Sequence, residues 1–245
     1  MNNHFTITID SCQQEEWIRK CIESCITQNY DNFEVILVDA ISTDKTFEIA
    51  KEYETCNYFK AYQNEIRVPQ IANILWLTKT SKEGSIIVSV DGDDWLKNKD
   101  VLSYLNNIYN SGDIWVTYGT YENYPYGTRA GWVYEYPEHV RRHNLFRQYD
   151  WLGTHLRTYK RELFLKIDEN DFKRADGEWM DTTGDMAFMI PLLEMSGEKS
   201  KYINDILYVY NAGNSSSDSN LNRIRQIEME KYIRTKKIYT PIDKW

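Results

Sequence analysis

The stretch SIIVSVDGDDWL, residues 85–96, decides the fold because it joins a strand-forming apolar run to three acids. A continuous apolar run of this length is typical of a strand that is buried on both faces in a parallel sheet. Like charges packed so closely repel one another, so water, a metal ion or a cationic partner has to offset them. Carboxylates at alternate positions, here Asp91 and Asp93, can grip one hard cation such as Mn²⁺ or Mg²⁺.

The same acids also have simpler explanations. Acids and glycine at a strand end often form a turn, and Asp94 is expected to cap the helix that follows. A calcium-binding EF-hand loop starting at Asp91 would need glycine at its sixth position, where Leu96 stands. Phosphatases of the haloacid dehalogenase type want Thr or Val two positions after their second Asp, and Trp95 stands there. The pattern therefore favours a hard-cation site at Asp91 and Asp93.

The first hundred residues alternate between strand and helix. Apolar runs predict strands over residues 5–9, 32–39, 58–63 and 85–90, and helical spacing of apolar residues predicts helices between them. Such an alternation favours an α/β fold in which helices cover both faces of a parallel, Rossmann-like sheet.

Acids follow three of these predicted strands. Asp10 follows the first, Asp39 the second, and the Asp91 cluster the fourth. Since ligands of such sheets bind at the carboxyl ends of the strands, these acids are expected to meet at one rim.

Composition limits the class of protein. The chain has 245 residues, 42% of them hydrophobic and 27% charged, as expected for one α/β domain or two small ones. A net charge of −8 disfavours nucleic acid as a partner. We expect no signal peptide and no transmembrane segment. Four cysteines without a CxxC pair argue against zinc and for a reducing, cytoplasmic setting, with peripheral membrane association left open.

The second half is less regular. Residues 101–110 and 182–197 have helical patterns, 113–118 and 205–211 have strand patterns, and 155–167 reads as a strand followed by a helix. Between them lies a long aromatic, glycine-rich stretch, residues 119–139, of a kind that is often functional. A charged helix is expected over about residues 221–239.

Three motifs together resemble the family 2 glycosyltransferases of the GT-A fold. ESCITQNYDNFEVILVD matches the family's SxxxQxY before an acidic strand, ISTDKT corresponds to GSTDxT, and DGDDW corresponds to DADDW. The resemblance is clearest over residues 5–96 and continues more weakly to about residue 220. It implies a single domain with a mixed, Rossmann-like sheet flanked by helices. Residues 1–100 would bind a nucleotide-sugar, residues 101–220 an acceptor, and residues 221–245 would form a C-terminal helix and tail.

The resemblance also implies roles for the rim residues. Asp39 would hydrogen-bond the nucleotide base, Asp91 would contact the ribose or share the metal, and Asp93 would bind Mn²⁺ or Mg²⁺ on the diphosphate. The residues that would contact the donor are Asp10, Ser11, Cys12, Asp39, Asn73 and Asp91. The general base of an inverting member falls on Asp185, with Asp181 as an alternative. Asp185 could also be an acid that simply suits a helix N-terminus.

Acceptor contacts are expected in the second half. Trp132, Trp151 and Trp179 are candidates for stacking on sugar rings, and each could instead pack in the core. His155 precedes a segment that often lines the family's active site, and it could equally be a structural histidine.

The chain departs from the family pattern at several positions. Ala40, Ile41 and Gly184 replace an acid, a glycine and a glutamate, and Asn211 and Asn214 stand where many members have a histidine.

The acids at the strand ends and the family motifs together predict a metal-dependent, inverting glycosyltransferase of polysaccharide biosynthesis. It would use a UDP-sugar or a related donor and a glycan or lipid-linked glycan acceptor. A non-catalytic scaffold of the same fold and a nucleotidyltransferase are the alternatives.

Overall fold

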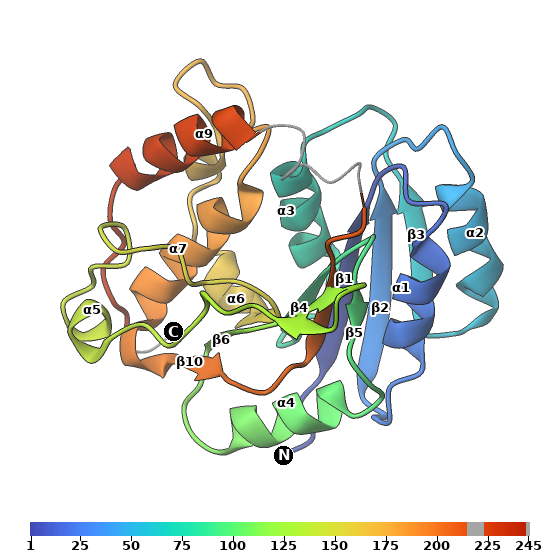
Figure 1. Ribbon diagram of the computed structural model, residues 1–245, viewed down its shortest axis with the longest axis horizontal. Helices are drawn as coiled ribbons and strands as arrows, with labels where there is room; N and C mark the ends of the chain where they lie inside the picture. The colour runs from blue at the N-terminus through green and yellow to red at the C-terminus, as the bar shows by residue number, and fades with distance from the viewer. Residues whose placement is uncertain (215–222, 244–245) are drawn as a thin grey trace.

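The computed structural model describes residues 1–214 and 223–243, which contain two β-sheets and the helices around them (Figure 1). The larger sheet has the strand order β10-β6-β9-β4-β1-β2-β3. Its strands are β1 (Phe5–Ser11), β2 (Phe33–Asp39), β3 (Phe59–Gln63), β4 (Ile86–Asp91), β6 (Val116–Gly119), β9 (Arg157–Lys160) and β10 (Ser200–Ile203). The sheet is mixed, because β9 runs antiparallel to β4 and β6 while the other neighbours are parallel. The predicted α/β class and Rossmann-like sheet are confirmed.

The register of the parallel strands brings the acids to one rim. Asp10 on β1 pairs with Asp91 on β4, and Ser11 pairs with Asp39 on β2. Parallel strands end on the same side of a sheet, so the three acids share the carboxyl edge.

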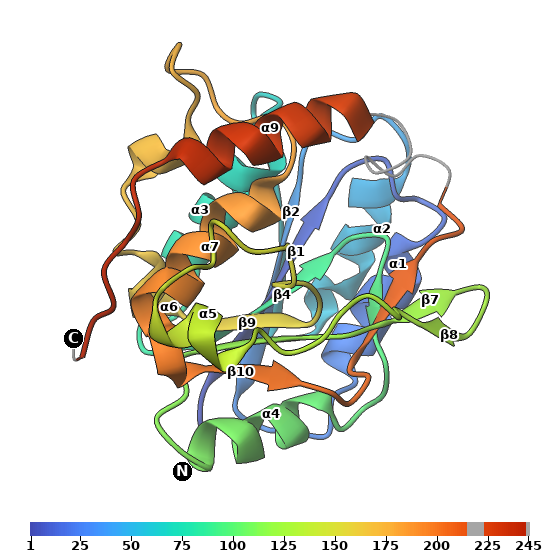
Figure 2. The ribbon, with the colours of Figure 1, turned by 60° about the vertical axis from the view of Figure 1, so that its left-hand side comes forward.

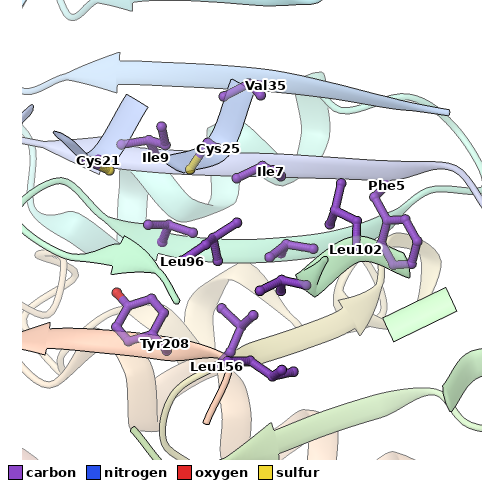
Figure 3. Packing of buried hydrophobic residues seen from close by; sticks show 14 of the residues in the cluster. Phe5, Ile7, Ile9, Cys21, Cys25, Val35, Leu96, Leu102, Leu156 and Tyr208 are labelled. Atoms are coloured by element: carbon purple, nitrogen blue, oxygen red, sulfur yellow. The ribbon is translucent and has the colours of Figure 1, made fainter. Parts of the chain in front are cut away.

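One face of the sheet is covered by α1 (Ile18–Ile26), α2 (Thr46–Glu52) and α4 (Val101–Asn110). Figure 3 shows Ile7, Ile9 and Val35 of the sheet packed beside Cys21 and Cys25 of α1. The two thiols lie one helical turn apart and are completely buried, as the sequence predicts. This packing fixes β1 and β4, the strands that end in the acid cluster.

The other face is covered by α3 (Gln70–Thr80), α6 (Arg161–Phe164) and α7 (Gly184–Ser196). Helix α7 is apolar around its whole circumference, because it lies between the sheet and α9 (Arg223–Thr235) (Figure 2). Nearly all its residues are buried, and Asp185 in its first turn keeps an exposed edge. The core thus holds Asp185 at a fixed height above the sheet.

A smaller sheet with the order β5-β11-β7-β8 lies beside the acid cluster. Its strands are β5 (Trp95–Leu96), β7 (Glu122–Tyr124), β8 (Thr128–Arg129) and β11 (Tyr208–Asn211). The hairpin β7–β8 and helix α5 (Glu138–Arg142) occupy the stretch in which the sequence showed no period. Short 3₁₀ turns η1 (Tyr53–Thr55), η2 (Glu169–Phe172) and η3 (Gly197–Lys199) complete the elements.

The structure corrects the expected role of Asp94 and describes only part of the expected C-terminal segment. Asp94 does not cap a helix: Asp100 precedes α4, and the Asp94 carboxylate instead accepts a hydrogen bond from the backbone N–H of Asn211, at 2.7 Å. The short strand β5 separates Asp94 from the helix. Of the expected C-terminal helix and tail, residues 221, 222, 244 and 245 lie outside the described residues.

Candidate active site

Asp10 is the first acid of the rim, and asparagine side chains hold it. Asn73 on α3 donates to Asp10 Oδ1 at 2.6 Å and accepts from Asn64 at 2.7 Å. Burial, opposed by the hydrogen bond from Asn73 and assisted by the neighbouring Asp91 and Asp39, raises the pKa of Asp10 to about 7. Asp10 therefore changes charge near neutral pH, next to the other acids.

Asp39 is completely buried at the end of β2. Its carboxylate accepts hydrogen bonds from the Ser42 backbone N–H at 2.8 Å, from the Ser42 hydroxyl, and from Gln63 at 3.0 Å. A carboxylate offers about four lone-pair positions, so these three bonds leave room for one more donor. Beside it, Ser11 is buried, and the half-buried Cys12 directs its thiol to the Ala40 carbonyl oxygen at 3.7 Å.

The sequence DGDD divides its acids among different partners. Asp91 accepts from Gln70 at 3.1 Å, and its backbone N–H donates to the Tyr208 hydroxyl at 3.1 Å. Asp93 accepts from Asn214 at 2.7 Å. Burial raises the pKa of Asp91 to about 6; Arg157 opposes this rise, and Asp93 adds to it. The charges of Asp91 and Asp93 thus affect one another.

Gly92 is required by close approach rather than by its backbone angles. A Cβ at this position would lie 2.8 Å from both Cβ and Oγ of Ser11, and 3.0 Å from the carbonyl oxygen of Asp10. The turn that contains Gly92 therefore packs directly against the end of β1.

Gly92→Ala is expected to lower the free energy of unfolding by about 1–3 kcal/mol, because the added methyl forces the backbone and Ser11 apart. Gly112→Ala is the matched control, since a Cβ there meets no atom within 4 Å. Urea unfolding of both variants measures the effect. Equal stability of the two variants would show that the structure around Ser11 can accommodate the added methyl group.

Asp10→Asn is expected to stabilise the protein in chelator, because the amide keeps the acceptor for Asn73 and removes a buried acid. A raised pKa means that the stabilisation Asp10 gives is complete below its unfolded value of 3.8 and is lost as the pH rises to about 7. The gain in melting temperature should therefore grow between these limits and then level off. The exposed Asp176, whose pKa is lowered from 3.8 by the Glu178 backbone N–H, changes its contribution only below pH 3.8, so Asp176→Asn should show no trend between pH 3.8 and 7. A constant gain for Asp10→Asn at every pH would refute this assignment.

His155 lies under the rim and faces the acids. It is buried, its ring stacks on Tyr208 with centroids 4.5 Å apart, and its Nδ1, which makes no hydrogen bond, lies 4.0 Å from Asp91 Oδ2. Burial and the nearby Arg157 lower the pKa of His155 well below its usual value, so the ring is neutral. Among the described residues, Asp91, Asp94 and His155 offer ligand atoms within 4.8 Å of one another. Carboxylates suit Mn²⁺ and Mg²⁺, and a neutral imidazole is a common metal ligand, so the residues present fit a divalent ion.

Asp185 and Asp181 have different surroundings. Arg157, at the start of β9, donates to Asp185 Oδ2 at 3.0 Å, and the same guanidinium lies 3.8 Å from Asp91 Oδ2. Asp181 instead pairs with Arg225 of α9 at 2.8 Å. Asp185 is thus joined to the acid rim through one guanidinium, whereas Asp181 pairs with Arg225 of α9 and with Arg174.

The tryptophans are placed unequally. Trp132 is 49% exposed and hydrogen-bonds Tyr121, whose ring meets His155 edge-on at 5.6 Å. Trp151 is half-buried against the apolar cluster around α7, and Trp179 lies near Lys173 and is also half-buried. Trp132 is thus linked to the histidine of the site through the Tyr121 ring.

Sequence reasoning missed several residues that organise the site: Gln63, Gln70, Arg157 and Tyr208. Strand alternation gives no signal for Arg157, because β9 begins at that residue and His155 precedes the strand. Gln70 and Tyr208 come from elements that gave no local hint, since only the tertiary fold brings them to Asp91.

Comparison with known proteins identifies the family. A family model described as glycosyl transferase family 2 matches residues 6–168. The chain belongs to glycosyl transferase family 2. Within the family it is 26% identical to the glycosyltransferase GlyG of Streptococcus pneumoniae over 231 residues, 86% of this chain and 71% of the relative. It is 30% identical to GlyA of the same organism over 110 residues, 44% of this chain and 15% of the relative.

Solved structures show the same GT-A fold. Staphylococcus aureus TarS covers 94% of this chain at a TM-score of 0.67 and 17% identity, and this chain spans 41% of that chain. The mannosyltransferase PcManGT of Pyrobaculum calidifontis, solved with GDP-Man and Mn²⁺, covers 98% at a TM-score of 0.67 and 17% identity, with 66% of its chain matched. Among the residues described here, no helix has the length and apolar character needed to cross a bilayer.

Proposed function

We propose that this protein transfers a sugar from a nucleoside-diphosphate sugar to a hydroxyl group of a glycan acceptor, with inversion at the anomeric carbon. One observation carries the proposal: the acids at three strand ends meet at one rim, and a single guanidinium joins that rim to Asp185 on the opposite side. The arrangement provides a site for a donor and, next to it, a carboxylate for the acceptor.

The base and ribose of the donor would bind along Asp10, Ser11, Cys12 and Asp39. Asp39 would accept from an N–H of the base, the role that the family resemblance implies. A UDP-sugar is our first choice of donor. TarS has been solved with UDP and with UDP-GlcNAc, whereas PcManGT holds GDP-Man, so the family scaffold accepts both kinds of base.

Asp91 and Asp93 would hold a divalent ion, Mn²⁺ or Mg²⁺, on the diphosphate. When bound, such an ion acts as a Lewis acid that offsets charge on the leaving diphosphate. Asp93 is favoured over Asp94 because Asp94 is almost fully buried, whereas Asp93 is half-buried. Asp91 would be a ligand in both arrangements, with Asp93 or with Asp94 and His155.

Asp185 would act as the general base. It would take the proton of the acceptor hydroxyl while the hydroxyl oxygen attacks the anomeric carbon and the bond from that carbon to the diphosphate oxygen breaks. Residues 101–214 would supply the acceptor contacts, with Trp132 stacking on a sugar ring.

A panel of UDP-, GDP- and TDP-sugars with Mn²⁺ tests the proposal by thermal stabilisation, followed by a turnover assay with each donor that binds. We expect at least one donor to raise the melting temperature only when Mn²⁺ is present, and to be turned over. Binding without any turnover would favour the non-catalytic alternative. No stabilisation by any nucleotide-sugar would contradict the proposal.

A further inference from the structure

Arg157 occupies an unusual position between the proposed donor site and the proposed base. Its backbone pairs with Ser89 of β4, and the next residues of β9 pair with β6. Its side chain is only 7% exposed. The Nη2 group donates to Asp185 at 3.0 Å and lies 3.1 Å from Nε2 of His155, and Nη1 lies 3.8 Å from Asp91. One planar group thus spans both acids.

Charge explains why a buried guanidinium is stable here. Burial alone would lower the pKa of Arg157, but Asp185, Asp91, Tyr208 and Asp94 raise it, so the group stays protonated. Of the Asp185 carboxylate, Oδ1 accepts from the Met186 backbone N–H at 2.8 Å and Oδ2 accepts from Arg157 at 3.0 Å. Arg157 therefore fixes the second oxygen and, with it, the rotation of the carboxylate.

The shape of the side chain matters as much as its charge. A guanidinium presents its N–H groups in a rigid fork, whereas a lysine ammonium is a point charge on a flexible stem. From its position on β9, a guanidinium can direct N–H groups toward Asp185 and Asp91 at the same time, whereas a single ammonium group cannot. Misplacement of a reacting group by about 1 Å can cost about 10²-fold in rate.

The geometry points to Arg157 as a positioning residue: we infer that it fixes the Asp185 carboxylate relative to Asp91, so that the base meets the acceptor hydroxyl at the correct distance from the donor. This inference rests on the proposed function. It concerns catalysis through Asp185 and requires no contact between Arg157 and the substrate.

The test combines Arg157→Lys with a matched control and a double-mutant cycle. Arg157→Lys should lower kcat for transfer by about 10²-fold while the donor KM changes by less than about threefold. Arg147→Lys is the control, because Arg147 is also buried and pairs with a carboxylate, Glu194 at 2.7 Å, on the far part of α7. It should cost stability without this selective loss of kcat.

The cycle separates positioning from general damage. In an Asp185→Asn background, the further change Arg157→Lys should leave the residual rate unchanged, because its effect acts through a base that is already absent. An equal loss in both backgrounds, or an unchanged kcat in Arg157→Lys alone, would overturn the inference. If Arg157→Lys and Arg157→Gln both fail to fold while Arg147→Lys folds, Arg157 is structural and the inference is wrong. Full transfer by Asp185→Asn would instead overturn the proposed base itself.

Discussion

Asp185→Asn is expected to lower the rate of glycosyl transfer by about 10²–10⁴-fold, the usual contribution of a general base. Asparagine keeps the size of the side chain and an oxygen that can accept from Arg157, so the fold should survive. Donor affinity should change little, because Asp185 lies across the guanidinium from the rim. Initial rates and calorimetric titration with the donor measure the two effects separately.

Asp181→Asn is the matched control for this prediction. It lies four positions earlier and pairs with Arg225 and Arg174 instead of Arg157. Its transfer rate should stay within about threefold of the unsubstituted protein, as for a surface ion pair of small energetic value. If Asp181→Asn abolished transfer and Asp185→Asn did not, Asp181 would be the base.

Asp93→Asn is expected to lower the transfer rate by at least about 10²-fold at low Mn²⁺, because one anionic ligand of the diphosphate-bound ion is lost. Raising the Mn²⁺ concentration should recover part of the rate. The dependence of rate on Mn²⁺ concentration is therefore the informative measurement, since a folding defect would not be corrected by the ion.

His155→Gln distinguishes the two possible ligand sets. If the ion binds Asp91 and Asp93, this change should leave the Mn²⁺ dependence nearly unaltered. If the ion binds Asp91, Asp94 and His155 instead, His155→Gln should weaken Mn²⁺ binding and Asp93→Asn should not. Electron paramagnetic resonance of Mn²⁺ in titrations without substrate reports this binding independently of activity.

The fold could be predicted from the sequence because its signals are local. The apolar runs of β1, β2 and β4 are each followed by an acid, and the fully buried face of α1 shows as a 3.6-residue period through Cys21 and Cys25. Parallel pairing then places the acids together without further information. The rim of the candidate site was for this reason accessible from the sequence.

The rest depends on contacts between distant segments. Asp94 was expected to cap a helix, but the fold pairs it with the backbone of Asn211, more than a hundred residues away. The loss of the family's glutamate at Gly184 is explained by packing against α3. A Cβ at Gly184 would lie 3.3 Å from Cβ of Ile71 and 3.4 Å from the side-chain oxygen of Gln70, whose amide nitrogen donates to Asp91. Such compensation is visible only in three dimensions.

Calorimetric titration of the unsubstituted protein with UDP, in Mn²⁺ and again in excess chelator, tests the central claim most directly. The claim is that the rim formed by Asp39, Asp91 and Asp93 binds a nucleoside diphosphate through a divalent ion. Saturable binding in Mn²⁺ that disappears in chelator is the predicted result, with GDP and TDP as the comparison ligands. Equal binding in both conditions, or no binding of any of the three nucleotides, would contradict it.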